Sequence, residues 1–289
     1  MEKVILSGCG PAGVCSFLLG THEGSIQLVT SAGTYLKLDD RMVLLCRERW
    51  GIVPIGISLQ NYETLLALNP APGQPVIVRD GTVRFPSGSA RLHLTAAERA
   101  GKGGQIRETA LFRLAQTLAD EDRKAGLAPL VTRMLPGKES WEPPNPYCVS
   151  ALPAIRTLLE GVAAGDRGRI ARGLDALLGL GPGLTPSGDD VICGIQYVLL
   201  RSHAAERAGV RMLTQAVAAG APVKTNAVSA AYLTAIACGE DYARMQGVWL
   251  EMTGRETSRA GLLLEVGSCS GGDMLFGMLA AGKLVMDLG

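Results

Sequence analysis

The apolar residues of this chain change their spacing once, near Leu94, and this change constrains the fold more than any other feature. Before it, short apolar runs are separated by glycine, asparagine, aspartate and proline. The runs are Val4–Leu6, Ile26–Thr30, Met42–Cys46, Ile52–Ile57, Val76–Val78 and Val83–Phe85. Short runs between turn residues are typical of the strands of a barrel or a sandwich. We therefore predict a β-rich N-terminal part of one of these two kinds.

The dipeptide Asp80-Gly81 is the sharpest local signal in this part of the chain. Both central residues of a two-residue hairpin turn need a positive φ, which Asp-Gly accepts readily. The sequence therefore predicts a hairpin turn between Val76–Val78 and Val83–Phe85.

After the change in spacing, apolar residues recur at the period of a helix. The first such set is Ile106, Ala110, Leu111, Leu114, Ala115 and Leu118. Further helices are predicted over roughly 151–164, 166–178, 188–203, 206–219, 225–238, 241–253 and 272–286. Because strands come first and helices second, the sequence predicts an α+β protein, with a β-rich part followed by an all-helical part.

The chain is long enough, at 289 residues, for two domains. We predict a β-rich domain over 1–95, a helix and a Pro-rich connection over 96–146, and a helical domain over 147–289. The Pro-rich stretch Leu135–Pro146 cannot form the interior of a helix. We expect it to be a surface connection between two adjoining units.

Charge and composition argue against several classes of partner. The formal net charge is +1, which gives no electrostatic reason to bind nucleic acid or an anionic membrane. The N-terminus lacks a signal-peptide pattern, and the most apolar stretches are too short to span a bilayer. The seven cysteines are scattered and only three histidines accompany them, so neither a zinc site nor a disulfide framework is expected. We expect a cytoplasmic protein.

Gly8–Gly13 matches the pattern GxGxxG, which joins a strand to a crossover helix in dinucleotide-binding proteins. The stretch available for that helix, residues 14–20, is too short for a crossover. The apolar runs that follow resemble hairpins, with Ser31-Ala32-Gly33 between two of them. We therefore interpret the glycines as a β-turn in a barrel strand.

The segment with the strongest functional pattern is Gly179–Asp190, which leads from one predicted helix into the next. Its glycines at 179, 181 and 183 allow a positive φ and a close approach of the backbone to a ligand. Thr185 and Ser187 are of the type that caps helices, and Asp189 and Asp190 fall in the first helical turn. The N–H groups of such a turn, with the helix dipole, favour an anion.

The two carboxylates of this segment leave three roles open. They could bind Mg²⁺ and so recruit a phosphate-bearing ligand, orient the glycine loop through hydrogen bonds, or supply a general base. An ordinary helix start after a turn is the structural alternative for any single residue of the segment.

A second copy of the pattern Ser-Gly-x-Asp-x-x-x-Gly lies near the C-terminus. The first copy is Ser187–Gly194 and the second is Ser270–Gly277. We expect two helix N-termini that face one cavity, with Gly194 and Gly277 permitting close packing of the two helices. A chance match in a Gly-rich protein is the alternative.

The segment Lys224-Thr225-Asn226 precedes another apolar helix and could add anion contacts, unless Thr225 is a plain N-cap. The candidate catalytic residues are Asp189, Asp190 and Asp273, and a metal, if one binds, is expected at Asp189 and Asp190. The candidate substrate-binding residues are Gly181, Gly183, Thr185, Ser187, Gly188, Lys224, Thr225, Asn226, Ser229, Ser270, Gly271 and Gly272.

Three segments resemble the family named for the AllH subunit of oxamate carbamoyltransferase. They are 179–190, the helix over 225–239 with its Ser229, and 267–275, where the triplet at 268–270 departs slightly from the family pattern. The resemblance covers most of the chain, strongly from about 150 to 282 and loosely before.

The resemblance implies a subunit of a multi-chain transferase in anaerobic purine and allantoin breakdown. There, carbamoyl-oxamate (oxalurate) and phosphate give oxamate and carbamoyl phosphate. Helix N-termini with Gly-rich loops suit such small anions. Carbamoyl transfer can proceed by positioning and oxyanion stabilisation, without a covalent nucleophile.

The expected partners are a small anionic substrate (oxamate, carbamoyl phosphate or phosphate) and the other subunits of the transferase. No cofactor is firmly expected, and Mg²⁺ is the one that the carboxylates allow for. Two other functions stay open. One is a non-catalytic assembly subunit of such a complex, and the other is a stand-alone Mg²⁺-dependent phosphotransferase.

Overall fold

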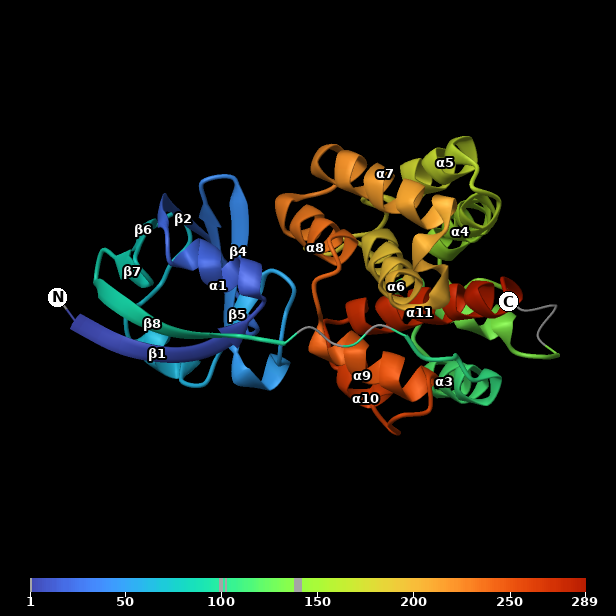
Figure 1. Cartoon of the computed structure of the whole chain (residues 1–289), viewed down its shortest axis with the longest axis horizontal. Helices are drawn as coiled ribbons and strands as arrows, with labels where there is room; N and C mark the ends of the chain where they lie inside the picture. The colour runs from blue at the N-terminus through green and yellow to red at the C-terminus, as the bar shows by residue number, and fades with distance from the viewer. Residues whose placement is uncertain (1, 99–100, 102, 138–141) are drawn as a thin grey trace. The chain divides into compact units, whose positions relative to one another are not determined.

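The structure is a computed structural model that describes residues 2–98, 101, 103–137 and 142–289. It divides into two compact units (Figure 1). The first comprises Met1–Ala100 together with Glu240–Ala243, and the second comprises Gly101–Gly239 together with Arg244–Gly289. The first unit holds the strands and the second is helical, which confirms the predicted α+β class.

The first unit is a closed barrel, so the barrel rather than the sandwich is confirmed. Its strand order is β1-β5-β4-β3-β2-β6-β7-β8, and the parallel pairing of β1 with β8 closes it. The strands are β1 Glu2–Gly10, β2 Thr21–Val29, β3 Gly33–Leu38, β4 Arg41–Arg47, β5 Gly56–Leu59, β6 Pro75–Arg79, β7 Thr82–Phe85 and β8 Gly88–Ala96. Short helices α1 Ala12–Leu18, η1 Glu48–Trp50 and α2 Tyr62–Leu66 lie between them.

The hairpin predicted at Asp80-Gly81 is confirmed. Their φ angles are 48° and 71°, and Arg79 pairs with Thr82 across the turn between β6 and β7. Side chains that alternate toward the interior of the barrel form its core, among them Leu6, Leu36, Leu45, Ile57 and Val83.

The GxGxxG segment belongs to the barrel and not to a βαβ unit. β1 runs to Gly10, and the seven-residue helix α1 follows it where we expected a β-turn. A Cβ atom on Gly8 would lie 2.5 Å from Ile57 Cγ2, and one on Gly10 would lie 2.4 Å from the carbonyl oxygen of Gly56. The glycines therefore let β1 approach β5 closely, which is a packing requirement of the barrel.

The second unit is built from helices. They are α3 Glu108–Asp120, η2 Ala128–Met134, α4 Pro146–Ala164, α5 Arg167–Leu177, α6 Ser187–Arg201, η3 His203–Glu206, α7 Ala208–Lys224, α8 Ala227–Ala237, α9 Ala243–Met252, α10 Ala260–Leu264 and α11 Ser270–Asp287. Every helix predicted in this part of the sequence is present, with ends shifted by a few residues. None of the helices within the described ranges is long and apolar enough to cross a membrane.

The predicted Pro-rich connection lies between η2, which ends at Met134, and α4, whose N-cap is Asn145. The Asn145 side chain accepts a hydrogen bond from Cys148 N at 3.0 Å. Residues 138–141 of the predicted connection are outside the described residues.

Helices α6 and α11 form the centre of the helical unit (Figure 1). Nearly all residues of α6 and most residues of α11 are buried. A Cβ atom on Gly194 would lie 2.2 Å from the carbonyl oxygen of Met274. Reciprocally, a Cβ atom on Gly277 would lie 2.2 Å from the carbonyl oxygen of Val191. The two glycines therefore allow the helix backbones to touch, as the repeated motif predicted.

Candidate functional site

The glycine loop between α5 and α6 has the backbone that its sequence predicts. Gly179, Gly181 and Gly183 have φ angles of 77°, 110° and 103°. Gly188 N donates to Leu180 O at 2.9 Å, which folds the loop back onto the start of α6. The tip of the loop, residues 182–184, is exposed. The loop is therefore held at both ends and open to solvent in its middle.

Asp189 ties this loop to the start of α8. Its Oδ1 accepts from Gly179 N at 2.8 Å, and its Oδ2 accepts from Thr225 Oγ1 at 2.5 Å and from Ser229 Oγ at 2.6 Å. The side chain is buried, with 1% of its surface exposed. Since both oxygens are occupied, the geometry favours the role in which this carboxylate orients the glycine loop.

Asp190 and Asp273 lie together where α6 and α11 begin. They are 2% and 0% exposed. Burial, and next the charge of Asp273, raise the pKa of Asp190 well above its usual range, while hydrogen bonds from Ser270 and Thr185 oppose the shift. Burial also raises the pKa of Asp273 to about 6. The charge of Asp273 therefore influences the ionisation of Asp190, as expected of like charges in one buried place.

Four groups oppose the rise in the pKa of Asp273. They are the Ser187 hydroxyl, the backbone N–H groups of Leu127 and Ala128, and the charge of Arg123. The two N–H groups donate to Asp273 Oδ1 at 2.6 Å and 2.7 Å. Asp273 therefore also fixes the start of η2 against α11.

The two copies of the motif exchange their contacts. Asp190 on α6 takes a hydrogen bond from Ser270 on α11, and Asp273 on α11 takes one from Ser187 on α6. Thr185 Oγ1 lies 2.9 Å from Ser270 Oγ. The glycine contacts of the two helices are reciprocal in the same way. Each motif therefore contacts the equivalent part of the other motif. The repeated pattern is therefore one structural site and not two separate helix caps.

One oxygen of each carboxyl has no hydrogen bond. Asp190 Oδ2 and Asp273 Oδ2 are buried without a partner among the residues that the structure describes. Buried polar atoms in folded proteins almost always have a partner, so each exception needs an explanation. A proton, a water molecule or a cation would each supply one.

The expected capping roles are wrong at two places, because the hydroxyls bond to tertiary partners instead. Pro186 holds the N-cap position of α6, and its carbonyl oxygen accepts from Asp189 N and Asp190 N. Thr185 and Ser187 make no capping bond there. At α8 the N-cap is Asn226, whose Oδ1 accepts from two backbone N–H groups at 3.1 Å, and not Thr225.

The remaining predicted residues separate into two groups. Lys224 Nζ pairs with Asp175 Oδ1 at 2.5 Å, so its charge is directed to α5. A Cβ atom on Gly271 would lie 1.9 Å from Leu263 O, and one on Gly272 would lie 3.1 Å from Ala128 Cβ. These two glycines therefore serve the packing of the first turn of α11.

Sequence reasoning missed two residues of the site. Arg123 donates from Nη1 to Ser268 O at 2.9 Å and from Nη2 to Leu264 O at 2.8 Å, which holds the loop before α11. Gly126 has a φ of 71°, and a Cβ atom there would lie 2.6 Å from Asp273 Oδ2. The available signal for these two residues was a charged segment after α3 that ends in glycine. Nothing in that segment indicates contact with the second motif, which lies about 150 positions away.

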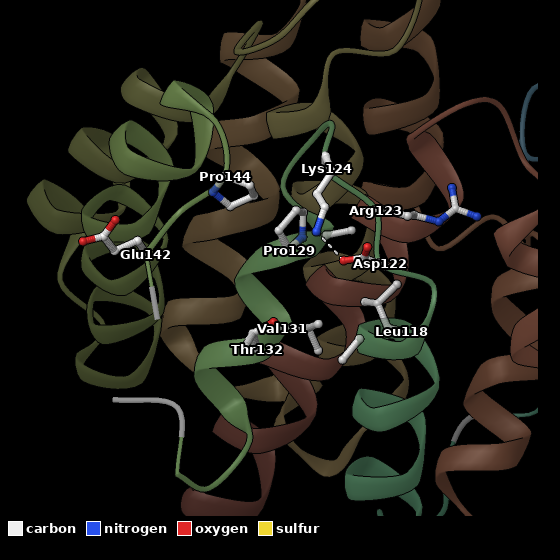
Figure 2. Close-up of a pocket in the computed structure, with 11 residues that line it drawn as sticks. Leu118, Asp122, Arg123, Lys124, Pro129, Val131, Thr132, Glu142 and Pro144 are labelled. Atoms are coloured by element: carbon white, nitrogen blue, oxygen red, sulfur yellow. Dashed lines mark hydrogen bonds and ion pairs between the residues drawn. The ribbon is translucent and has the colours of Figure 1, made fainter. Parts of the chain in front are cut away.

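A cavity of about 170 Å³ lies beside α3 and η2 (Figure 2). None of the predicted site residues lines it. Its lining comprises Leu118, Ala119, Asp122, Arg123, Lys124, Ala128, Pro129, Val131, Thr132, Glu142 and Pro144. Lys124 and Asp122 pair with each other, while the Arg123 side chain extends away from them. Arg123 is thus shared between the cavity wall and the α11 site.

The described part of the chain contains no group of three or more histidine, cysteine, aspartate or glutamate side chains placed to hold a metal ion. Comparison with curated proteins gives no match, and comparison with solved structures gives none either. Both copies of the motif lie within residues 177–282, and this segment matches the family model described as oxamate carbamoyltransferase subunit AllH, which confirms the resemblance over this segment of the chain.

Proposed function

We propose that this chain is a subunit of a carbamoyltransferase of the oxamate carbamoyltransferase kind, and that its helical unit binds a small anionic substrate where α6 and α11 begin. The exchanged Ser–Asp contacts between these helices carry the proposal. They lie within the segment that matches the family model. Two helix N-termini at one place add two positive dipole ends, which favour an anion.

Thr185 and Ser270 are the groups best placed to contact the substrate. Their hydroxyl oxygens are 2.9 Å apart, both residues are partly exposed, and Thr185 directly follows the exposed loop tip at 182–184. Each hydroxyl can rotate its proton from its neighbour toward a bound oxygen atom. Oxamate, carbamoyl phosphate and phosphate all present such oxygens.

The reaction that fits is transfer of a carbamoyl group between the amide nitrogen of oxamate and an oxygen of phosphate, in purine or allantoin breakdown. Hydroxyl and N–H donors would stabilise the negative charge that develops on the carbamoyl oxygen. Asp189 acts as a positioning residue, since both its oxygens are used within the fold. Asp190 and Asp273 each keep a free oxygen within the described structure, so they are the candidates for proton transfer or for metal binding.

The test uses the chain assembled with its partner subunits. Thr185→Val and Ser270→Ala should each lower phosphorolysis of carbamoyl-oxamate on the order of 10²-fold, because each removes one donor to the developing charge. Thr214→Val is the control, since Thr214 is half-buried on α7, away from this place in the sequence, and its side chain bonds to Arg211 O within its own helix. Activity of the two site variants equal to that of the control would contradict binding at this place.

A non-catalytic assembly role is the second candidate, and one observation favours it. Several residues of the two motifs have a structural role within the chain. Both oxygens of Asp189 accept hydrogen bonds, and Gly194 and Gly277 allow the close packing of α6 and α11. In that case the complex needs the chain but tolerates Thr185→Val. ATP turnover by the chain alone would instead indicate the Mg²⁺-dependent phosphotransferase. Location in the cytoplasm and the absence of nucleic-acid and membrane partners stay predictions.

A further inference from the structure

The two carboxyls of the site share one feature. Asp190 Oδ2 and Asp273 Oδ2 are both buried and both lack a hydrogen bond within the described structure, and the charge of Asp273 acts on Asp190. Two buried carboxylates without compensation are costly. Their charge is offset either by a bound proton or by a positive partner.

The neighbouring side chains do not supply this partner directly. The charge of Arg123 acts on Asp273, but its guanidinium donates to Ser268 O and Leu264 O. Asp189 on α6 acts on Asp190 as a further negative charge. Burial, and also the negative charge of the pair, raise the pKa of the neighbouring thiols, Cys193 on α6 and Cys148 on α4.

We propose that Asp190 and Asp273 together bind one divalent cation of the Mg²⁺ class, with hydroxyl oxygens of Thr185, Ser187 and Ser270 as further ligands or as hydrogen-bond acceptors from its waters. All five groups offer oxygen, the ligand that hard cations such as Mg²⁺ and Mn²⁺ prefer. Mg²⁺ is usually held by one or two carboxylates and completes its shell with water and substrate phosphate.

This assignment differs from the metal site expected from the sequence. Asp189 and Asp190 are adjacent in the chain, but Asp189 Oδ1 and Oδ2 are occupied by three donors. The second carboxylate is Asp273, which is 83 positions away from Asp190 and reaches it through the crossing of α6 and α11. Thr185 and Ser270, which both hydrogen-bond to Asp190, are partly exposed, so the site has contact with solvent on the side of these two hydroxyls.

The cation would also explain how an anion can bind beside two carboxylates. It would balance their charge and leave coordination positions for oxygens of phosphate or of an oxamate carboxylate. This last step rests on the proposed function, whereas binding of the cation by the chain alone does not.

The test is titration of the full-length chain with Mn²⁺ at pH 8, without anion or partner subunits, followed by electron paramagnetic resonance. The wild type should bind about one Mn²⁺ per chain, and Mg²⁺ should compete for it. Asp190→Asn and Asp273→Asn should each weaken Mn²⁺ binding by at least about tenfold. Asp175→Asn is the matched control, since this exposed aspartate of α5 pairs with Lys224, and it should bind like the wild type.

Ser270→Ala tests the same site if the aspartate variants do not fold. This substitution keeps both carboxyl groups and removes one neutral hydroxyl group. It should weaken Mn²⁺ binding several-fold with an unchanged circular dichroism spectrum. No saturable binding by the folded wild type at millimolar Mn²⁺, or equal affinity in all four variants, would overturn the proposal and leave a shared proton to explain the free oxygens. Mn²⁺ binding without anion binding would support the cation site and contradict only the proposed function.

Discussion

Single residues of the glycine loop illustrate how local sequence sets local geometry. Gly183 has a φ of 103°, and a Cβ atom there would meet no atom within 4 Å. The conformation, and not a lack of space, therefore demands glycine at this position. Gly73 in the barrel unit has the same two properties, with a φ of 82°.

This pair of glycines makes the first prediction. Gly183→Val and Gly73→Val should each cost about 1–3 kcal/mol of stability, because a β-branched residue is strained at positive φ. Only Gly183→Val should also abolish binding of phosphate or oxamate, since only its loop leads into α6 and contacts the start of α11 through Thr185 and Ser270. Urea unfolding measures the first effect and calorimetry the second. Equal anion affinity in the two variants would remove Gly183 from the site.

At the residue scale, the sequence could predict a feature only where neighbouring residues in the chain determine it. The positive φ of Gly183 and the Asp80-Gly81 turn follow from the residues themselves. The partner of a polar side chain does not. Thr225 and Asn226 are both good capping residues, and only the position of Asp189 decides that Thr225 turns away from the helix. Arg123 was missed for the same reason.

At the scale of elements, the crossing of α6 and α11 is the feature on which the site depends. It brings the two Ser-Gly-x-Asp motifs together, and Gly194 and Gly277 allow it. The sequence predicted both helices from their period and the close packing from the repeated glycine. It could not show that the serines and aspartates exchange partners between the helices, because that depends on which way the helices face.

Alanine at the crossing gives the prediction for this scale. Gly194→Ala and Gly277→Ala should each destabilise the helical unit by at least about 2 kcal/mol, since each new methyl group would meet a backbone carbonyl that cannot move aside. Gly261→Ala is the control, because this glycine of α10 has no atom within 4 Å of an added Cβ. Alanine there should be neutral or stabilise by about 0.5 kcal/mol. Thermal unfolding monitored by circular dichroism distinguishes the three.

The strands show the complementary limit of prediction from sequence. β8 alternates buried Ala90 and Leu92 with exposed Arg91 and His93, so its period of two was present but charged residues interrupted the apolar signal. Its parallel pairing with β1 joins the two ends of the barrel sequence. No short-range pattern encodes that pairing, which is why the sequence left barrel and sandwich as equal alternatives.

At the scale of the whole molecule, the chain forms two units with separate cores, and the boundary is not a single point in the sequence. Glu240–Ala243 groups with the barrel although helical residues flank it on both sides. Ala243 N donates to Ile52 O at 2.8 Å within this unit. The site lies in the helical unit. The segment that matches the family model also lies in this unit, with the exception of Glu240–Ala243.

Two variants that place a methyl group against a backbone carbonyl test this division. Gly10→Ala would do so in the barrel, 2.4 Å from Gly56 O, and Gly194→Ala in the helical unit, 2.2 Å from Met274 O. Separate cores should confine each loss of protection to the unit that carries the variant. Hydrogen exchange followed by mass spectrometry should therefore show Gly10→Ala loosening the barrel and, with it, peptides over 240–243, while α6 and α11 keep their protection. Gly194→Ala should give the opposite pattern and leave 240–243 unchanged. Loss of protection spread evenly over both units in either variant would mean that the chain unfolds as one cooperative body. The loss of a ligand or cation in a site variant could then no longer be assigned to the helical unit alone.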